Sequence, residues 1–394
     1  MAASYQLSSY QLSEEHQDFR RAVAAFAADQ LAPHVNRWNA AHELPMEAVK
    51  QMGHFGLFGL SGPEEYGGAG DFTSLCIAIE EIGKIDQSLG ITLEAAVGLG
   101  ANPLAQFGTE EQKQRWLPDL LAGHALAAFG LTEPESGSDA LAMRTRASDD
   151  EDGWVINGSK QFITNSGTDL TSVIIVTART GTRDNGKPEI STLIVPHGTE
   201  GLEIGPSYRK LGWHASDTHP VSLSDVRVPH DHLLGVRGKG YSQFLSILDD
   251  GRIAIAALAL GCIRACRDLS VSYALERQAF GGPIGRKQAV AFKIADLDVM
   301  CHAAGLLVYA AATMRDRGAP AAELKRAASV AKLYATEAAV TATRIATQVF
   351  GGYGFMEEYP IARFYRDAKA LEIGEGTSEV QRLLIARGLG LPVE

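Results

Sequence analysis

The sequence of 394 residues predicts a mainly helical protein with a central β domain. Three observations indicate this fold class. Apolar residues recur at helical spacing near both ends of the chain, β-branched runs separated by turn signals fill the middle, and 45% of all residues are hydrophobic. A chain of this length and composition can bury an ordinary globular core in two or three domains.

The first residues contain a short duplication. Residues 4–8 (Ser-Tyr-Gln-Leu-Ser) are repeated at once as residues 9–13. Because each copy is too short to be a structural repeat, we expect a mobile leader and an ordered chain from about Ser13.

The region from there to about Gly123 is expected to be helical. Apolar residues recur at helical spacing from Phe19 onward. Thr109 and Gln112 form a capping box that opens a helix, and Gly123 is placed to close it. We therefore predict a helical domain over residues 1–123.

Residues 124–237 are expected to form a small sheet or barrel. The pair Asn157-Gly158, with β-formers on both sides at 154–156 and 161–164, predicts a hairpin turn. Gly-rich or Pro-bounded turns separate further β-branched runs. These runs are 173–177, 190–195 and 221–228.

The remaining residues, 238–394, return to long helical patterns. Their lengths suit a helical bundle. The expected helices span residues 241–277, 287–317 and 321–350.

Charge and hydropathy narrow the function classes. A net charge of −11 and a pI near 5.5 argue against nucleic acid, which needs a basic face. The longest uninterrupted apolar run, Ile253–Ile263, is far shorter than the roughly 20 residues of a membrane span, so we expect a buried helix. Glu14 and Glu15 stand where a transit peptide avoids acids. These features favour a cytoplasmic protein without a membrane span.

Cysteine and histidine spacing predicts no metal site. The four cysteines form no Cys-x-x-Cys pair and are expected to be small buried thiols. The sequence His230-Asp-His232 beside a proline is expected to be a solvated loop.

Two segments concentrate glycine, hydroxyl groups and acids. Residues 131–139 (Leu-Thr-Glu-Pro-Glu-Ser-Gly-Ser-Asp) suit a polar ring edge or a phosphate, although an ordinary turn has the same composition. In the second segment Gly374 and Gly376 leave the Glu375 carboxylate unshielded by neighbouring side chains. Glu375 is thus either catalytic or an acid near the start of the following helix.

Taken together, the chain resembles the acyl-CoA dehydrogenase family from about residue 13 to residue 388. The motifs that carry the resemblance occur in the family's order. They are Pro63-Glu-Glu-Tyr-Gly-Gly68, Leu131–Asp139, Phe162-Ile-Thr-Asn165, Ser216-Asp-Thr218, Leu248-Asp-Asp-Gly-Arg252, Glu276-Arg-Gln-Ala-Phe-Gly281, Gln348-Val-Phe-Gly-Gly352, Arg366-Asp-Ala-Lys369 and Glu375-Gly-Thr-Ser378.

The resemblance implies an N-terminal helical domain, a middle β-barrel domain and a C-terminal four-helix bundle, assembled as a homotetramer (dimer of dimers). It implies that FAD accepts two hydrogens from the α and β carbons of an acyl-CoA, giving the trans-2-enoyl-CoA. Electron-transferring flavoprotein would then receive the electrons.

By resemblance, Glu375 is the catalytic base. Some relatives carry the base on the helix just before Arg252, but here that position is Gly251. Substrate-binding positions are Ser138, Asp249, Arg252 and Gly376, although Arg252 has an alternative role as a helix cap. FAD-binding positions are Phe129, Leu131, Thr132, Ser138, Phe162, Ile163, Thr164, Arg277, Phe280, Gln288, Gln348, Val349, Gly351, Gly352, Thr377 and Glu379, some of them supplied by a neighbouring subunit.

Two residues depart from common family patterns. Glu135 stands where glycine is frequent and is expected to add charge near the flavin loop. Gly374 stands where a bulky aromatic residue is common, which suggests a pocket for a branched or short acyl group. An acyl-CoA oxidase that uses oxygen, and a catalytically silent flavin or acyl-CoA binding subunit, are the alternative functions.

Overall fold

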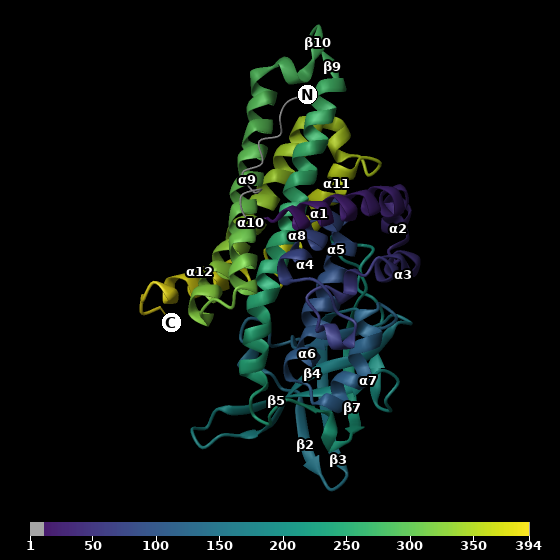
Figure 1. The fold of residues 1–394 in the computed structure, drawn as a ribbon, viewed down its shortest axis with the longest axis vertical. Coiled ribbons are helices and arrows are strands. Elements are labelled where there is room, and N and C mark those ends of the chain that lie inside the picture. Colours follow the sequence, from purple (N-terminus) through teal and green to yellow (C-terminus); the bar gives the residue numbers. More distant parts are fainter. Residues whose placement is uncertain (1–11, 394) are drawn as a thin grey trace.

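The computed structural model describes residues 12–393 (Figure 1). The duplicated leader lies outside the described residues. Ser13 caps the first helix, because its side chain accepts a hydrogen bond from the backbone N–H of His16. Helices form both ends of the described chain and strands its middle, so the predicted fold class is confirmed.

The N-terminal region is helical. Its α7 has the predicted capping box between Thr109 and Gln112, and Gly123 follows it with φ +72°. A π-helical segment, Ala95–Ala101 (η6), extends α5. The helices are α1 (Glu14–Phe26), α2 (Val35–Ala41), α3 (Met46–His54), α4 (Phe72–Ile85), α5 (Gln87–Glu94), α6 (Asn102–Phe107) and α7 (Glu110–Leu121).

The middle of the chain forms an eight-stranded mixed sheet. Its strands follow the order β6-β7-β3-β2-β4-β5-β8, and β1 pairs in parallel with β4. Apolar side chains of β3, β4, β5 and β7 form its core. The strands are β1 (Leu126–Gly130), β2 (Arg146–Asp150), β3 (Gly153–Thr164), β4 (Thr171–Thr182), β5 (Pro188–Pro196), β6 (Leu202–Ile204), β7 (Thr218–Val228) and β8 (Leu233–Leu234).

The predicted hairpin turn at Asn157-Gly158 is wrong. The strand β3 runs through this pair, and its register with β7 shifts between Ile156 and Gly158. Two hydrogen bonds join Asn157 and Asp225 across the register shift. The Asn157 side-chain amide donates to the Asp225 carboxylate at 3.0 Å, and its amide oxygen accepts from the Asp225 backbone N–H at 2.8 Å. Asn157 therefore faces two residues of β7, Ser224 and Asp225, so the extra residue of this β-bulge lies on β7, where Asp225 adopts φ +53°.

The C-terminal region is a bundle of long helices, as predicted. Figure 1 shows α8, α9 and α10 side by side, with the short β9–β10 hairpin at one tip. The elements are α8 (Gly240–Glu276), β9 (Gln278–Ala279), β10 (Gly282–Pro283), α9 (Gln288–Asp316), α10 (Ala321–Phe350), α11 (Pro360–Leu371) and α12 (Ser378–Gly388).

Helix α9 is long and apolar enough, by length and composition, to cross a membrane. That property alone is weak evidence, because core helices of soluble proteins share it. In this structure α9 packs against α8 and α10. We therefore describe it as a helix of the bundle.

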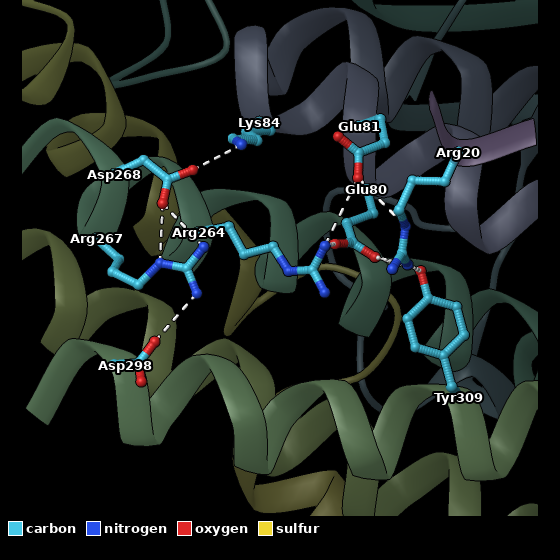
Figure 2. Close-up of polar contacts among 9 residues, drawn as sticks. All are labelled: Arg20, Glu80, Glu81, Lys84, Arg264, Arg267, Asp268, Asp298 and Tyr309. Carbon is cyan, nitrogen blue, oxygen red and sulfur yellow. Dashed lines mark hydrogen bonds and ion pairs between the residues drawn. The ribbon is translucent and has the colours of Figure 1, made fainter. Parts of the chain in front are cut away.

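The N-terminal helices and the C-terminal bundle share one hydrophobic core. Buried ion pairs cross the same interface (Figure 2). Arg20 of α1 donates to Glu80 of α4 at 3.0 Å and to the Tyr309 hydroxyl of α9 at 2.6 Å. Arg264 of α8 contacts both Glu80 and the adjacent Glu81. Four helices from both ends of the chain thus meet at one charged cluster.

The cysteines are all buried, whereas the two histidines of the His-Asp-His sequence lie in different surroundings. All four cysteines are free and buried, which confirms that prediction. The expectation of a solvated His230–His232 pair is only half right. His230 is exposed and pairs with Asp149, whereas His232 is buried and bonds to the carbonyl of Ile194. Within residues 12–393 no group of three acidic, histidine or cysteine residues is arranged to hold a metal.

Candidate active site

Glu375 lies on the turn between α11 and α12. It adopts φ +52°, a conformation that residues other than glycine rarely take, and Gly376 follows with φ +92°. Thr377 then caps α12 by accepting a hydrogen bond from Val380. Glu375 therefore precedes the helix cap, and the alternative of an ordinary acid in the first helical turn does not apply. Strained backbone of this kind is typical of functional sites.

The Glu375 carboxylate is shielded from water. The residue as a whole is half-buried, but both carboxylate oxygens are buried and have no hydrogen-bond donor among residues 12–393. A Cβ atom at Gly251 would lie 1.9 Å from Oε2 of this carboxylate. The glycine on α8 thus provides the space that the acid occupies.

Two cationic side chains approach this carboxylate from different helices. Arg252 of α8 is buried and pairs with Asp249 at 2.5 Å, which ties together two predicted substrate-binding residues. It lies inside α8, so it does not cap a helix end. Lys332 of α10 is fully buried and donates to the carbonyl oxygen of Gly376 at 2.6 Å. Lys332 therefore holds the turn that carries Glu375.

These surroundings tune the acidity of Glu375. Burial raises its pKa, since the charged form loses its hydration. The adjacent carboxyl of Glu94 on α5, and the charges of Lys332 and Arg252, oppose that rise. A general base works best with a pKa near the operating pH, so the direction of the shift suits a base.

The backbone N–H of Glu375 is also available. It has no acceptor among the described residues. A free N–H beside a shielded carboxylate can stabilise an oxygen that gains negative charge when a neighbouring carbon loses a proton. The turn therefore presents an acid–base group and an oxyanion donor together.

The loop after β1 is held by a buried ion pair that the motif analysis did not single out. Lys160 of β3 donates to Glu133 at 2.8 Å and to the carbonyl of Leu131 at 3.1 Å. Glu133 also accepts hydrogen bonds from the backbone N–H groups of Arg144 and Thr145. A loop fixed in this way is preorganised for a ligand, which favours the binding interpretation over a plain turn.

The end of β3 lies beside this loop. The N–H of Gln161 donates to the carbonyl of Thr132 at 2.8 Å. Phe162 adopts φ +62°, leaves 61% of its surface exposed and packs against Tyr208 with 5.4 Å between ring centroids. Residues 163–164 return to pairing with β7. An exposed aromatic ring on strained backbone beside a polar loop fits a planar ring system such as a flavin.

The other flavin-binding predictions lie at the far end of the molecule. Arg277, Val349, Gly351 and Gly352 line an open hollow of about 520 Å³. Phe280, on the adjoining hairpin, is 91% exposed and has φ +51°. Figure 1 places this hairpin at the opposite end of the bundle from the β domain. A single chain therefore does not bring these residues to the β1 loop.

The remaining predicted residues are placed as follows. Phe129 of β1 stacks on Phe244 of α8, with 5.9 Å between ring centroids. Ser138 is exposed on the β1 loop. Exposed residues near the hairpin and on α12 are Gln288 at the start of α9, Gln348 near the end of α10 and Glu379 in the first turn of α12.

The expectation about Glu135 needs correction. Its carboxylate pairs with Arg144 on the surface of the loop. The neighbouring guanidinium therefore offsets the charge that Glu135 would add near the flavin loop.

Comparison with known proteins agrees with this fold and site. Models of the acyl-CoA dehydrogenase N-terminal, middle and C-terminal domains match residues 13–124, 128–226 and 238–390. A probable acyl-CoA dehydrogenase of Bacillus subtilis is 48% identical over 382 residues, which cover 97% of this chain and 99% of that protein.

Two solved structures are similar over nearly their whole length. One is the butyryl-CoA dehydrogenase of Megasphaera elsdenii, with a TM-score of 0.92 and 40% identity over 96% of this chain and 98% of that one. The other is a chain in the structure of the electron transferring flavoprotein of Acidaminococcus fermentans, with the same TM-score, identity and coverage.

The helical–β–helical fold, the water-shielded Glu375 carboxylate and the exposed Phe162 ring fit a flavoprotein oxidoreductase, the class to which these similar proteins belong. The chain belongs to the acyl-CoA dehydrogenase family. It uses FAD and removes hydrogens from the α and β carbons of acyl-CoA thioesters.

Proposed function

We propose that Glu375 is the base that removes the α-proton of the acyl-CoA. One observation carries this assignment: within residues 12–393 its water-shielded carboxylate has no hydrogen-bond donor and the N–H of the same residue has no acceptor. Position 251, where some relatives carry the base, is glycine. A base on α8 would need the volume that Glu375 fills.

The protein removes the proton, and the cofactor supplies the hydride acceptor. The Glu375 carboxylate takes the α-proton, and its backbone N–H stabilises the negative charge that develops on the thioester oxygen. FAD supplies the acceptor for the hydride that leaves the β carbon. The substrate thus loses one proton and one hydride and becomes the trans-2-enoyl-CoA, while Glu375 ends protonated.

Binding of FAD is assigned to two groups of residues. The isoalloxazine ring would be held by Phe129, Leu131, Thr132, Ser138 and Phe162 to Thr164, and Thr377 with Glu379 would lie near the phosphates. Arg277, Phe280, Gln288 and Gln348 to Gly352 would hold the adenosine side for a neighbouring subunit. The separation of the two groups supports an oligomer in which a second copy brings them together, and the proposed assembly is a homotetramer (dimer of dimers).

The acyl group is assigned as short or branched. Position 374 is glycine, and a Cβ there would meet only the Ala370 carbonyl, at 3.6 Å. The similar Megasphaera elsdenii enzyme acts on butyryl-CoA. Comparing kcat/KM for isobutyryl-, 2-methylbutyryl-, butyryl- and octanoyl-CoA tests this assignment. A clear preference for octanoyl-CoA would contradict it.

Electron-transferring flavoprotein is the proposed electron acceptor, in the cytoplasm. The similarity to a chain in such a structure supports this choice. Reoxidation of the reduced enzyme by that flavoprotein should greatly exceed reoxidation by dissolved oxygen. Rapid formation of hydrogen peroxide during turnover would instead indicate an oxidase.

Anaerobic titration of the yellow protein with butyryl-CoA tests the role of Glu375. Wild type should bleach, whereas Glu375→Gln should keep its FAD and remain oxidised, because the amide cannot accept the proton. Glu372→Gln is the matched control. That acid lies three residues earlier and pairs with Lys369, so its variant should bleach as wild type does. Bleaching of Glu375→Gln at the wild-type rate would refute the assignment and favour another base.

A further inference from the structure

A second carboxyl group lies in the same cleft as Glu375. Glu94 is the last residue of α5 and has no exposed surface. Both of its carboxylate oxygens are buried without a hydrogen-bond donor among residues 12–393. Gly98, one turn later, leaves room for them, since a Cβ there would lie 3.0 Å from Oε1. A buried charge without any partner is strongly unfavourable, so this group needs an explanation.

The group that faces Glu94 is Glu375 itself. The two carboxyls are within hydrogen-bonding reach of each other. Neither has another donor in the described part of the chain, so a hydrogen bond between them needs a proton carried by one of the two. Two ionised carboxylates in contact in a dry site would repel each other.

The surrounding charges decide which carboxyl is ionised. The positive charges of Arg252 on α8 and Lys332 on α10 favour the ionised form of Glu375, whereas the negative charge of Glu375 favours the protonated form of Glu94. Asp249 neutralises part of the Arg252 charge. The more distant acids Glu372 and Glu379 act on Lys332.

We propose that Glu94 is a positioning residue: it stays protonated in the free enzyme and donates its proton in a hydrogen bond to the Glu375 carboxylate. This inference rests on the proposed role of Glu375 as the base. The hydrogen bond keeps Glu375 ionised in a site without water and fixes the orientation of its carboxylate. Burial and the charge of Glu375 raise the pKa of Glu94 well above its usual value, in agreement with a protonated state.

Substitution at position 94 tests the proposal through the pH dependence of kcat/KM. Glu94→Leu removes the donor, so Glu375 should bind its proton more tightly. The acidic limb of the kcat/KM profile should therefore shift to higher pH by about one unit. Glu94→Gln keeps a donor, so the acidic limb of this variant should lie at nearly the same pH as that of wild type. The matched control is Thr92→Val, which removes a buried hydroxyl of the same helix that bonds only to the Ser88 carbonyl. Its limb should not move.

Infrared spectroscopy gives a readout that does not depend on turnover. The difference spectrum of oxidised wild type minus Glu94→Gln should show the C=O stretch of a protonated, buried carboxylic acid, because the subtraction cancels the band expected from Asp367. Absence of this band from the difference spectrum at neutral pH would overturn the proposal. Equal shifts of the acidic limb in the Leu and Gln variants, or no shift in either, would also overturn it.

Failure of this inference can be told apart from failure of the proposed function. If Glu375→Gln cannot be reduced but Glu94→Leu shows no shift, only the role of Glu94 is wrong. If Glu375→Gln is reduced normally, the assignment of the base itself fails.

Discussion

The Glu375 carboxylate occupies the space that a side chain at position 251 would fill, since a Cβ at Gly251 would lie 1.9 Å from its Oε2. We predict that Gly251→Ala keeps FAD but lowers kcat/KM by about 100-fold, because a displaced base loses its alignment with the α carbon. Flavin absorbance and steady-state kinetics measure the two effects. Gly388→Ala is the control, since its Cβ would meet only the Arg326 side chain, at 3.7 Å. Near-normal activity of Gly251→Ala would contradict the packing argument.

Lys332 supports Glu375 in two ways, through its hydrogen bond to the Gly376 carbonyl and through its charge. In Lys332→Met the pKa of Glu375 should rise, so the acidic limb of kcat/KM should move up by about one unit. Burial lowers the pKa of Lys332 to about 8, so wild type should show a bend near that pH that the variant lacks. Replacing the exposed Arg344 of the same helix by Met should change neither feature. An unshifted acidic limb in Lys332→Met would argue against the electrostatic role.

Asp367 on α11 should make stability depend on pH. Its carboxyl is buried and accepts a hydrogen bond from the Trp213 N–H at 2.6 Å, and burial raises its pKa from 3.8 to about 7. Between these values the folded protein holds a proton that the unfolded chain has released. Stability from this group is therefore present at low pH and is lost as the pH rises toward 7.

Asp367→Asn tests that dependence, because the amide is neutral at every pH. The thermal midpoint of the variant should fall less than that of wild type between pH 4 and pH 7. Asp119→Asn, at an exposed position, should follow the wild-type curve. Parallel curves for wild type and Asp367→Asn would show that Asp367 is ionised throughout.

Arg20 should contribute strongly to the stability of the helical half. Arg20→Met leaves Glu80 with one of its two arginine partners, and breaking a buried ion pair typically costs about 3 kcal/mol or more. Arg21→Met, which breaks only an exposed pair with Asp18, should cost less than about 1 kcal/mol. Urea denaturation measures both values. Equal stabilities of the two variants would mean that the buried pair adds little.

The regular elements of the fold could be predicted from the sequence because their signals are local. The cap formed by Thr109 and Gln112 and the helix that ends at Phe350 are examples. The Asn157-Gly158 pair misled the prediction because its turn preference is a local signal, whereas the pairing with β7 that carries β3 straight through this pair depends on residues far along the chain.

The site was only partly predictable. Glu375 carried a signal in its flanking glycines, whereas Glu94 carried none, because an acid at the end of a short helix normally faces solvent. Lys160 and Glu133 lie 27 residues apart, and nothing in the sequence shows that they meet. Such contacts depend on how β1 and β3 lie together in the folded sheet.

The buried cluster around Arg20 also restricts the order in which the chain can fold. Its partner Tyr309 lies 289 residues further along the sequence. During synthesis the N-terminal helices leave the ribosome long before α9 exists, so their charged and apolar faces stay uncovered for most of translation. Contacts between segments so far apart in the sequence form slowly during folding. A nascent chain that stops before α9 is therefore expected to need a chaperone.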